Sequence, residues 1–212
     1  MRAVIITNGL IGSYSFLKTL INPEQDLIIC ADGGSEHALK AGITPNIIVG
    51  DFDSASSKTL AVFKEQGIPF IEYPAVKDKT DTELAIDYAI SKGYNEILLF
   101  GGFGSRIDHT LANIMLLASL SQKGIKVRAV DENNDLYVCL NKIEILGDPG
   151  EYISLIPLTA EVNGVTTHGL AYKLDNAVLT LGSTLPLSNR LSQKRGTVEI
   201  KDGILLVIKA KD

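Results

Sequence analysis

The sequence contains no tryptophan and only two cysteines, and its 20 lysines and arginines are outnumbered by 25 aspartates and glutamates. The resulting formal charge of −5 does not supply the basic surface that binding to a nucleic-acid backbone requires. The apolar runs, such as residues 97–100 and 204–208, are far shorter than the roughly 18 residues of a membrane span. We therefore expect neither nucleic acid nor a membrane as a partner, and no signal peptide or transmembrane helix.

Cys30 and Cys139 lie far apart, each within an apolar, strand-like stretch. Two such cysteines in a chain without a secretion signal favour buried, reduced thiols over a disulfide or a redox pair. The sequence therefore predicts a cytoplasmic protein. Its 212 residues, 45% of them hydrophobic and 21% charged, suffice for one large folded domain or two small ones.

The first 130 residues alternate short β-branched runs with helical segments, which is the pattern of a parallel sheet covered by helices. Several runs are apolar throughout, as expected of strands buried on both faces. Strands are predicted at residues 3–7, 27–31, 46–50, 69–73, 96–100 and 127–130. Helices, each closed by a glycine one or two residues further on, are predicted at residues 35–41, 57–66, 81–92 and 108–122.

Beyond about residue 132 the pattern changes to short alternating runs separated by turn signals such as Asn163-Gly164 and Asp202-Gly203. This half is predicted to be all β, with a final hairpin around Asp202-Gly203 that has one solvent-facing side. We place the domain boundary so that residues 1–135 form the α/β domain and residues 136–212 the β domain.

Acidic residues and glycines follow the predicted parallel strands. Because ligands of an open parallel sheet bind outside the carboxyl ends of its strands, these residues are expected to meet at one edge. Asp51 and Asp53, two apart in an extended stretch, are expected to point the same way, and Asp78 and Asp81 add a second pair of oxygens around a helix start. Carboxylates and substrate phosphates are the usual ligands of Mg²⁺, so the edge is predicted to be a metal-phosphate site.

The other residues of these loops suit a phosphate group, although each also has a plain structural explanation. Glycines let a phosphate approach the backbone, and Arg106 and Lys79 are able to neutralise its charge. Asp81 would also be favourable at a helix start for dipole reasons alone, and His109 would also suit a surface position. The chain has no G-x-x-x-x-G-K-[ST] loop, which excludes a P-loop nucleotide site.

Several of these stretches together resemble the thiamine pyrophosphokinase family. They are Ala31-Asp32-Gly33-Gly34, residues 50–54, residues 77–83, Gly101-Gly102 with residues 106–113, and Ser188-Asn189. The resemblance implies transfer of pyrophosphate from ATP to the hydroxyl of thiamine, which gives thiamine diphosphate and AMP and uses Mg²⁺. It implies a Rossmann-like α/β nucleotide-binding domain followed by a β-sandwich, in a homodimer whose active sites are shared between subunits.

Carried over residue by residue, the resemblance assigns Asp51, Asp53 and Asp81 to the metal, with Asp78 as a catalytic helper. It assigns Ser188 and Asn189 to thiamine. The residues that it assigns to ATP and its phosphates are Asp32, Gly33, Lys79, Thr80, Arg106, Asp108, His109 and Asn113. Since the chain has no tryptophan, a tyrosine, phenylalanine or leucine has to form the wall against the thiamine rings.

Two other functions fit parts of the sequence. An apolar strand followed by Asp51-Phe52-Asp53-Ser54 also begins an aspartyl-phosphate phosphatase, in which Asp51 would be the nucleophile. A non-catalytic sensor of nucleotide or thiamine is the second alternative. Neither explains both the β-rich second half and Ser188-Asn189.

Overall fold

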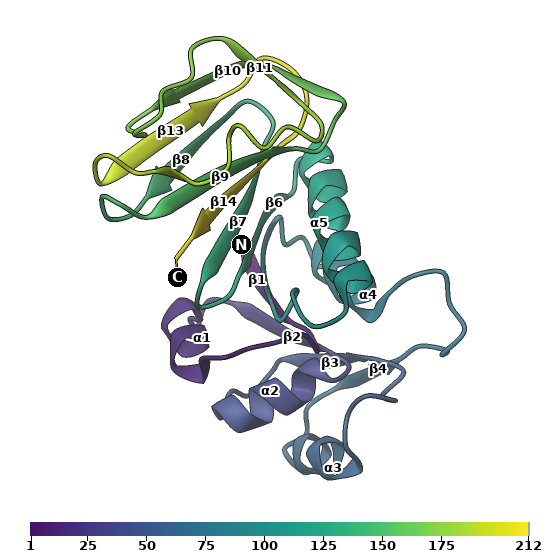
Figure 1. The fold of residues 1–212 in the computed structure, drawn as a ribbon. Helices are drawn as coiled ribbons and strands as arrows, with labels where there is room; N and C mark the ends of the chain where they lie inside the picture. The colour runs from purple at the N-terminus through teal and green to yellow at the C-terminus, as the bar shows by residue number, and fades with distance from the viewer. Residues whose placement is uncertain (212) are drawn as a thin grey trace. The chain divides into compact units, whose positions relative to one another are not determined.

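The computed structural model describes residues 1–211, and they divide into two compact units that we describe separately. The first unit comprises residues 1–116 and 124–132, and the second residues 117–123 and those from 133 onward. The strands of the first unit form a parallel sheet in the order β6-β5-β1-β2-β3-β4 (Figure 1). Their bounds are β1 (Arg2–Ile6), β2 (Leu27–Ala31), β3 (Ile47–Gly50), β4 (Phe70–Glu72), β5 (Glu96–Phe100) and β6 (Lys126–Val130). The predicted parallel sheet is thereby confirmed.

The helices of this unit cover both faces of the sheet because its central strands β1, β2 and β3 are buried on both sides. Val4, Ile28 and Ile48 belong to one core cluster, together with residues of α1, α2 and α3. The helix α4 packs against β1, β2 and β3. It covers the opposite face of the sheet, toward which the alternate residues of these strands point. The helix bounds are α1 (Tyr14–Leu20), α2 (Gly34–Ala41), α3 (Ser57–Glu65) and α4 (Asp81–Ser91). The helix α5 (Ile107–Gln122) belongs to the first unit up to residue 116.

Helix α1 is the element of the first unit that the sequence pattern did not predict. It has only seven residues, no acidic residue in its first turn, and it ends at Ile21 without a glycine. Its start is marked only by Ser13, whose side chain accepts a hydrogen bond from the Phe16 N–H at 3.2 Å. Its one fully buried residue, Leu17, packs into the core of the sheet. Tertiary packing therefore stabilises a helix too short to be stable alone.

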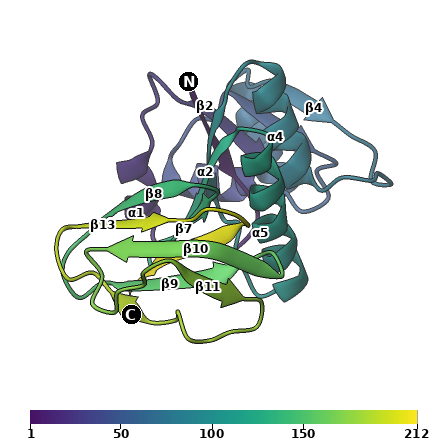
Figure 2. The ribbon, with the colours of Figure 1, turned by 90° about the horizontal axis from the view of Figure 1, so that it is seen from above.

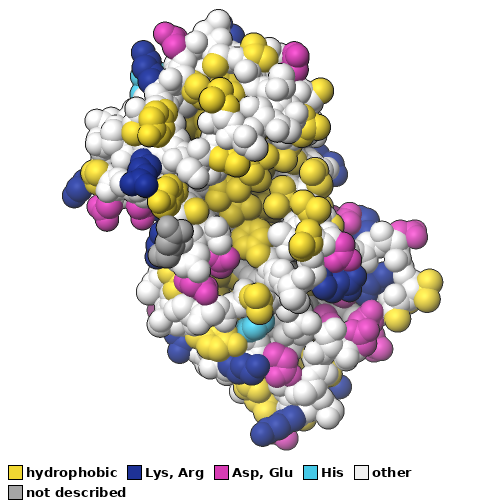
Figure 3. Space-filling model, in the orientation of Figure 1, with side chains coloured by type: hydrophobic (Ala, Val, Ile, Leu, Met, Phe, Trp, Pro, Cys, Tyr) yellow, Lys and Arg dark blue, Asp and Glu magenta, His cyan; other side chains and the backbone are white. Residues whose placement is uncertain are grey.

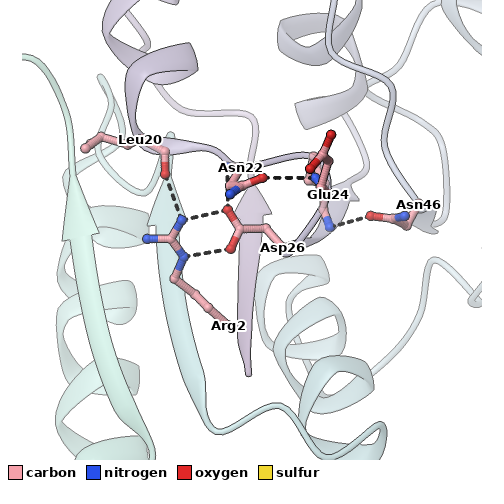
Figure 4. Close-up of polar contacts among 7 residues, drawn as sticks. Arg2, Leu20, Asn22, Glu24, Asp26 and Asn46 are labelled. Atoms are coloured by element: carbon pink, nitrogen blue, oxygen red, sulfur yellow. Dashed lines mark hydrogen bonds and ion pairs between the residues drawn. The ribbon is translucent and has the colours of Figure 1, made fainter.

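An ion pair holds the amino ends of β1 and β2 together, at the edge opposite the acidic loops. The Arg2 guanidinium donates to both carboxylate oxygens of Asp26, at 2.9 and 2.6 Å, and to the Leu20 carbonyl at 2.9 Å (Figure 4). The Asn22 N–H donates to the same carboxylate at 2.7 Å. Since the side chain of Asp26 is only 4% exposed, these donors compensate a charge that is removed from water.

The second unit is built from antiparallel strands in two layers. One layer has the order β12-β9-β14-β7 and the other the order β11-β10-β13-β8, in which the neighbours β10 and β13 run in opposite directions (Figure 2). Apolar residues of both layers form one core, for example Leu155 and Val207 with Val165 and Val198. The bounds are β7 (Asn134–Cys139), β8 (Lys142–Leu146), β9 (Tyr152–Pro157), β10 (Glu161–His168), β11 (Ala177–Thr180), β12 (Asn189–Arg190), β13 (Arg195–Glu199) and β14 (Leu205–Ala210).

The predicted final hairpin is wrong, although its turn exists. Gly203 has the expected positive φ of 97°, but β13 pairs with β8 and β10, whereas β14 pairs with β7 and β9. The chain crosses at Asp202 from one layer to the other, and Asn163 of β10 donates its N–H to the Asp202 carbonyl there. The crossing lets Val198 and Leu205 enter the common core from opposite layers.

The two cysteines are free and buried, as the sequence predicted. Burial raises the pKa of the Cys139 thiol to about 11, so this thiol stays protonated at neutral pH. Among the described residues, no helix combines the length and the apolar composition needed to cross a bilayer.

Replacement of Asp26 by asparagine is expected to lower the free energy of unfolding by about 2 kcal/mol at pH 7, because it leaves the Arg2 charge without its partner. Burial alone raises the pKa of Asp26, but hydrogen bonds from Arg2 and the Asn22 N–H outweigh it, and the pKa is lowered. The stability from this carboxylate is therefore present above the unfolded pKa of about 3.9 and lost as the pH falls through the lower folded value.

Urea unfolding of the wild type and Asp26→Asn between pH 3 and 7 measures this effect. The difference between the two proteins should shrink below about pH 3.9. Glu24→Gln, which neutralises an exposed carboxylate of the same turn, serves as the control and should change stability little. A difference that stays constant with pH would contradict the role of the ion pair.

Candidate active site

Two glycine loops lie against each other at the carboxyl ends of β1 and β5. The Gly9 N–H donates to the Gly101 carbonyl at 2.9 Å, and the Thr7 hydroxyl donates to the same carbonyl. A Cβ at Gly9 would collide with the carbonyls of Gly101 and Phe103, and Gly101 has a φ of 65°. Glycine permits this close approach because a Cβ at Gly101 would also collide with the Thr7 carbonyl. The loops therefore offer mainly backbone groups.

Asp32 follows β2 directly and is held in a left-handed conformation with φ 44°. Its N–H donates to the Val49 carbonyl of β3 at 2.8 Å. The residue is only 5% exposed, and its Oδ1 atom has no hydrogen-bond partner. Burial, together with the charges of Asp81 and Asp53, raises the pKa of Asp32. This buried carboxylate oxygen is therefore an acceptor that a cation or a donor group is able to use.

The loop after β3 brings Asp51 and Asp53 toward Asp32, but not in the extended conformation that the sequence suggested. Phe52 between them has a φ of 62°, and its ring packs edge-on against Phe70 with the centroids 5.5 Å apart. The half-buried ring packs against the core cluster and fixes the bend, and the Ser54 hydroxyl donates to Asp53 at 2.9 Å. The two carboxylates therefore lie together because the residue between them turns toward the core.

Asp32, Asp51 and Asp53 form an acidic cluster in which one ligand oxygen of each lies within 4.8 Å of the other two. Hard carboxylate oxygens at this spacing, one of them buried and unpartnered, fit a divalent cation such as Mg²⁺ or Mn²⁺. The sequence had grouped Asp81, and not Asp32, with the pair. In the structure Asp81 begins α4, whose N-cap residue Thr80 accepts a hydrogen bond from the Glu83 N–H.

Lys77 connects Asp81 to the acidic cluster. Its ammonium donates to Asp81 at 2.6 Å and to Asp51 at 3.0 Å, and its side chain is 14% exposed. The hydrogen bond from Lys77 lowers the pKa of Asp51. Figure 3 shows acidic and basic side chains next to one another beside the loop between β4 and α4. The sequence analysis did not single out Lys77. Because Lys77 lies in the loop before α4, the four-residue spacing that favours ion pairs within a helix gives no signal here.

Two consecutive residues of α2 hold the loops on either side of Asp32. Glu36 accepts a hydrogen bond from the Ser56 N–H at 2.8 Å, beyond Asp53. His37 donates from Nε2 to the Gly9 carbonyl at 2.8 Å and accepts at Nδ1 from the Tyr14 hydroxyl. The tautomer follows because a carbonyl only accepts. Burial lowers the pKa of His37, which keeps it neutral and able to accept from Tyr14.

A cavity of about 430 Å³ opens between these loops, entirely within the first unit. The Asn113 amide holds one of its walls by donating to the Gly102 carbonyl at 2.7 Å. Of the predicted site residues, those that line the cavity are Asp32, Thr80, Asp81, Arg106, His109 and Asn113. Lining residues to which the sequence analysis gave no role include Thr7, Leu10, Ser54, Thr82, Phe103 and Thr110.

The other predicted residues of the first unit lie around the cavity without lining it. Asp78 is exposed in the loop before α4. Lys79 pairs with Asp87 at 2.6 Å and with Glu83 at 3.3 Å. Asp108 is exposed and pairs with Arg106 at 2.6 Å. Gly33 is buried at the start of α2, where a Cβ would collide with the Asn8 side chain.

Ser188 and Asn189 belong to the second unit and have different surroundings. Asn189 is 5% exposed, and its side-chain amide pairs with both the N–H and the carbonyl of Tyr172, at 2.9 and 2.7 Å. Ser188 is exposed with φ 57°, and its N–H donates to the Ser154 hydroxyl. Asn189 therefore joins the segment of the exposed Tyr172 to its own segment, which carries the exposed Ser188 side chain.

Family models of two adjoining domains match the chain. One, described as thiamin pyrophosphokinase, catalytic domain, matches residues 18–129. The other, described as thiamin pyrophosphokinase, vitamin B1 binding domain, matches residues 141–205. The first match contains the whole acidic cluster and Lys77. The second contains Ser188 and Asn189.

Individual proteins are similar over nearly the whole chain. The thiamine pyrophosphokinase of Bacillus subtilis strain 168 is 38% identical over 191 residues, which is 89% of each sequence. A crystal structure of thiamine pyrophosphokinase from Bacillus subtilis has a TM-score of 0.91 at 34% identity and covers 100% of both chains. A crystal structure from Geobacillus thermodenitrificans has a TM-score of 0.86 at 32% identity and covers 100% of this chain and 98% of that one.

Replacement of Asp32 by asparagine is expected to stabilise the protein while weakening cation binding. Asparagine tolerates the left-handed backbone and removes a buried charge that faces Asp53 and Asp81, so the free energy of unfolding without divalent cations should rise by about 1 kcal/mol. Mn²⁺ affinity, measured by electron paramagnetic resonance of the free ion, should fall at least tenfold. Asp175→Asn, at an exposed position, is the control, and an unchanged Mn²⁺ affinity of Asp32→Asn would contradict the assignment.

Proposed function

Because the chain belongs to the thiamin pyrophosphokinase family, which makes thiamine diphosphate by pyrophosphate transfer, we propose that the cavity of its first unit binds the ATP and the metal ion of that reaction. The observation that carries this proposal is the convergence of Asp32, Asp51 and Asp53 beside a cavity walled by glycine loops. In this assignment residues 1–135 bind ATP and the metal, and residues 136–212 bind thiamine. The phosphatase alternative is not favoured by the family matches.

The metal ion is proposed to be Mg²⁺, held by Asp51, Asp53 and Asp81 with the buried oxygen of Asp32 beside them. Mg²⁺ prefers carboxylates together with substrate phosphates, and the acidic residues come from separate loops that leave one side open. When bound, the ion neutralises charge on the triphosphate. Without it, the carboxylates at this edge would repel a polyphosphate.

The remaining predicted residues are proposed to hold ATP. The Arg106 guanidinium offers a planar fork for two phosphate oxygens, since its present partner Asp108 is exposed and readily exchanged. Backbone groups of the loop from Gly101 to Gly104 approach the phosphates closely because no Cβ intervenes. The other residues proposed for this role, or for assisting it, are Gly33, Asp78, Lys79, Thr80, His109 and Asn113.

Pyrophosphate transfer then requires positioning more than covalent chemistry by the protein. The hydroxyl oxygen of thiamine bonds to the β-phosphorus, and the bond from that phosphorus to the AMP oxygen breaks with its electron pair left on AMP. The hydroxyl proton passes to a carboxylate of the site, such as Asp81, or to water. The protein residues hold the two substrates in line and stabilise the negative charge that moves to AMP.

Thiamine is proposed to bind beside Ser188 in the second unit. Asn189 acts indirectly, because its amide is used by the Tyr172 backbone. The exposed Tyr172 ring and the exposed Leu187 side chain are candidates for the apolar wall that no tryptophan provides. Thiamine needs such a wall because its rings are flat and aromatic, and the positively charged thiazolium is attracted to an aromatic face.

The protein is proposed to be a cytoplasmic homodimer with shared active sites. Ile107, Leu111 and Met115 form an apolar stripe along α5, four residues apart, and are 71%, 51% and 54% exposed. Apolar stripes of this kind mark protein interfaces. The two free thiols suit a reducing compartment, and the charge of −5 favours small-molecule partners over nucleic acid.

The activity is tested by AMP formation from ATP and thiamine with Mg²⁺, comparing the wild type with Asp53→Asn. We expect AMP and thiamine diphosphate only when both substrates and the metal are present, and a loss of turnover of at least roughly 1000-fold in Asp53→Asn at saturating Mg²⁺. Phosphate release without thiamine, with a phosphorylated Asp51, would support the phosphatase instead. Near-normal turnover of Asp53→Asn would overturn the metal assignment.

The shared site is tested by mixing two inactive variants, Asp53→Asn and the double variant Ser188→Ala, Asn189→Ala, under subunit exchange. Half of the dimers become hybrids with one intact site of two, so about a quarter of the wild-type activity should return. A mixture of Asp53→Asn with Asp51→Asn, both altered in the same half of the site, should regain none. Hybrid dimers seen by native mass spectrometry without recovered activity would mean that the site lies within one chain or excludes Ser188 and Asn189.

A further inference from the structure

Lys77 lies where a metal ion is expected to contact protein oxygens. Its ammonium is 3.0 Å from Asp51 Oδ2 and 2.6 Å from Asp81 Oδ1. In the part of the chain that the structure describes, Lys77 is the only basic residue that pairs with either carboxylate, since Arg106 pairs with Asp108 and Lys79 with Glu83 and Asp87. The two oxygens come from different loops, so Lys77 links the end of β3 to the start of α4.

The environment of this ammonium is strongly acidic. The side chains of Asp51 and Asp81 are 13% and 25% exposed, which weakens the screening of their repulsion by water. Asp32 and Asp53 bring further negative charge to the same edge. A positive group between the carboxylates is therefore needed to keep both loops close while no other cation is present.

The same oxygens cannot serve the ammonium and a metal ion equally well. Mg²⁺ binds carboxylate oxygens at 2.0–2.1 Å, and two positive groups at the same oxygens repel each other. Lys77 is able to leave, because it belongs to the loop of residues 73–80 between β4 and α4, next to Val76, which is 95% exposed. Its flexible four-carbon stem allows the ammonium to move without unfolding an element.

We propose that Lys77 is a positioning residue that acts as an internal counter-ion, holding Asp51 and Asp81 together until a divalent cation displaces its ammonium. This inference rests on the proposed use of the acidic cluster for a divalent cation. It makes Lys77 dispensable for the fold once the cation is bound. It also makes the ammonium a competitor of the cation.

The test uses the full-length protein, Lys77→Met, and Mn²⁺ as the probe, without substrates. Methionine keeps the unbranched stem and removes the charge. Without divalent cations Lys77→Met should unfold about 3 °C below the wild type, and at saturating Mn²⁺ the two unfolding temperatures should coincide. Mn²⁺ affinity, measured by electron paramagnetic resonance of the free ion, should be at least fivefold tighter in Lys77→Met.

Lys79→Met is the matched control, because Lys79 also pairs with two carboxylates of this region, Glu83 and Asp87, outside the acidic cluster. Its effect on the unfolding temperature should be the same with and without Mn²⁺, and its Mn²⁺ affinity should change less than twofold. Lys77→Arg, which keeps the charge, should restore the wild-type unfolding temperature in the absence of cations.

Each other outcome contradicts the inference in a recognisable way. An equal loss of stability with and without Mn²⁺, or an unchanged or weaker affinity in Lys77→Met, would make Lys77 a purely structural partner. If Lys77→Met folds only when it is purified with Mn²⁺, the proposal is supported, and failure to fold in Mn²⁺ as well would overturn it. A wild type that binds no Mn²⁺ would overturn the proposed metal site and the counter-ion role together.

Discussion

Repulsion between carboxylates at one edge of the parallel sheet is the constraint on which the rest of the first unit depends. Parallel strands end at the same edge, so acids that follow β2 and β3 and begin α4 inevitably meet. The structure brings Asp32, Asp51 and Asp53 together and offsets part of their charge with Lys77. The protein's own groups compensate only part of the negative charge of such a site, and a bound cation compensates the rest.

The parts that provide stability are separated from the parts that provide chemistry. At the amino ends of the strands Arg2 and Asp26 form a well-compensated buried ion pair, whereas at the carboxyl ends Asp32 keeps an unpartnered oxygen. Around it, Glu36 and His37 hold the neighbouring loops by single hydrogen bonds. The stability of the rest of the unit therefore offsets the electrostatic repulsion at the acidic edge, as is common at functional sites.

The second unit shows that neighbouring residues of one motif can have different surroundings in the fold. Asn189 is part of a stretch that resembles a thiamine contact, yet its amide is occupied by the backbone of Tyr172. In the structure Asn189 therefore holds the Tyr172 segment in place. The neighbouring Ser188 and Tyr172, both exposed, are the side chains able to touch a ligand directly.

The sequence alone determined the strands and the longer helices of the first unit, the all-β second half and the edge at which the acids gather, because these follow from periodicity, helix stop signals and strand order. Tertiary structure decided the rest. The seven-residue α1 exists only through the burial of Leu17, and the turn at Asp202-Gly203 joins two layers because Val198 and Leu205 share one core. Likewise Asp32 joins Asp51 and Asp53 because the ring of Phe52 packs edge-on against Phe70, and Lys77, not Lys79, reaches the acids because of the path of its loop. Local sequence encodes backbone preference, whereas these contacts depend on which side chains the folded core brings within a few ångströms of one another.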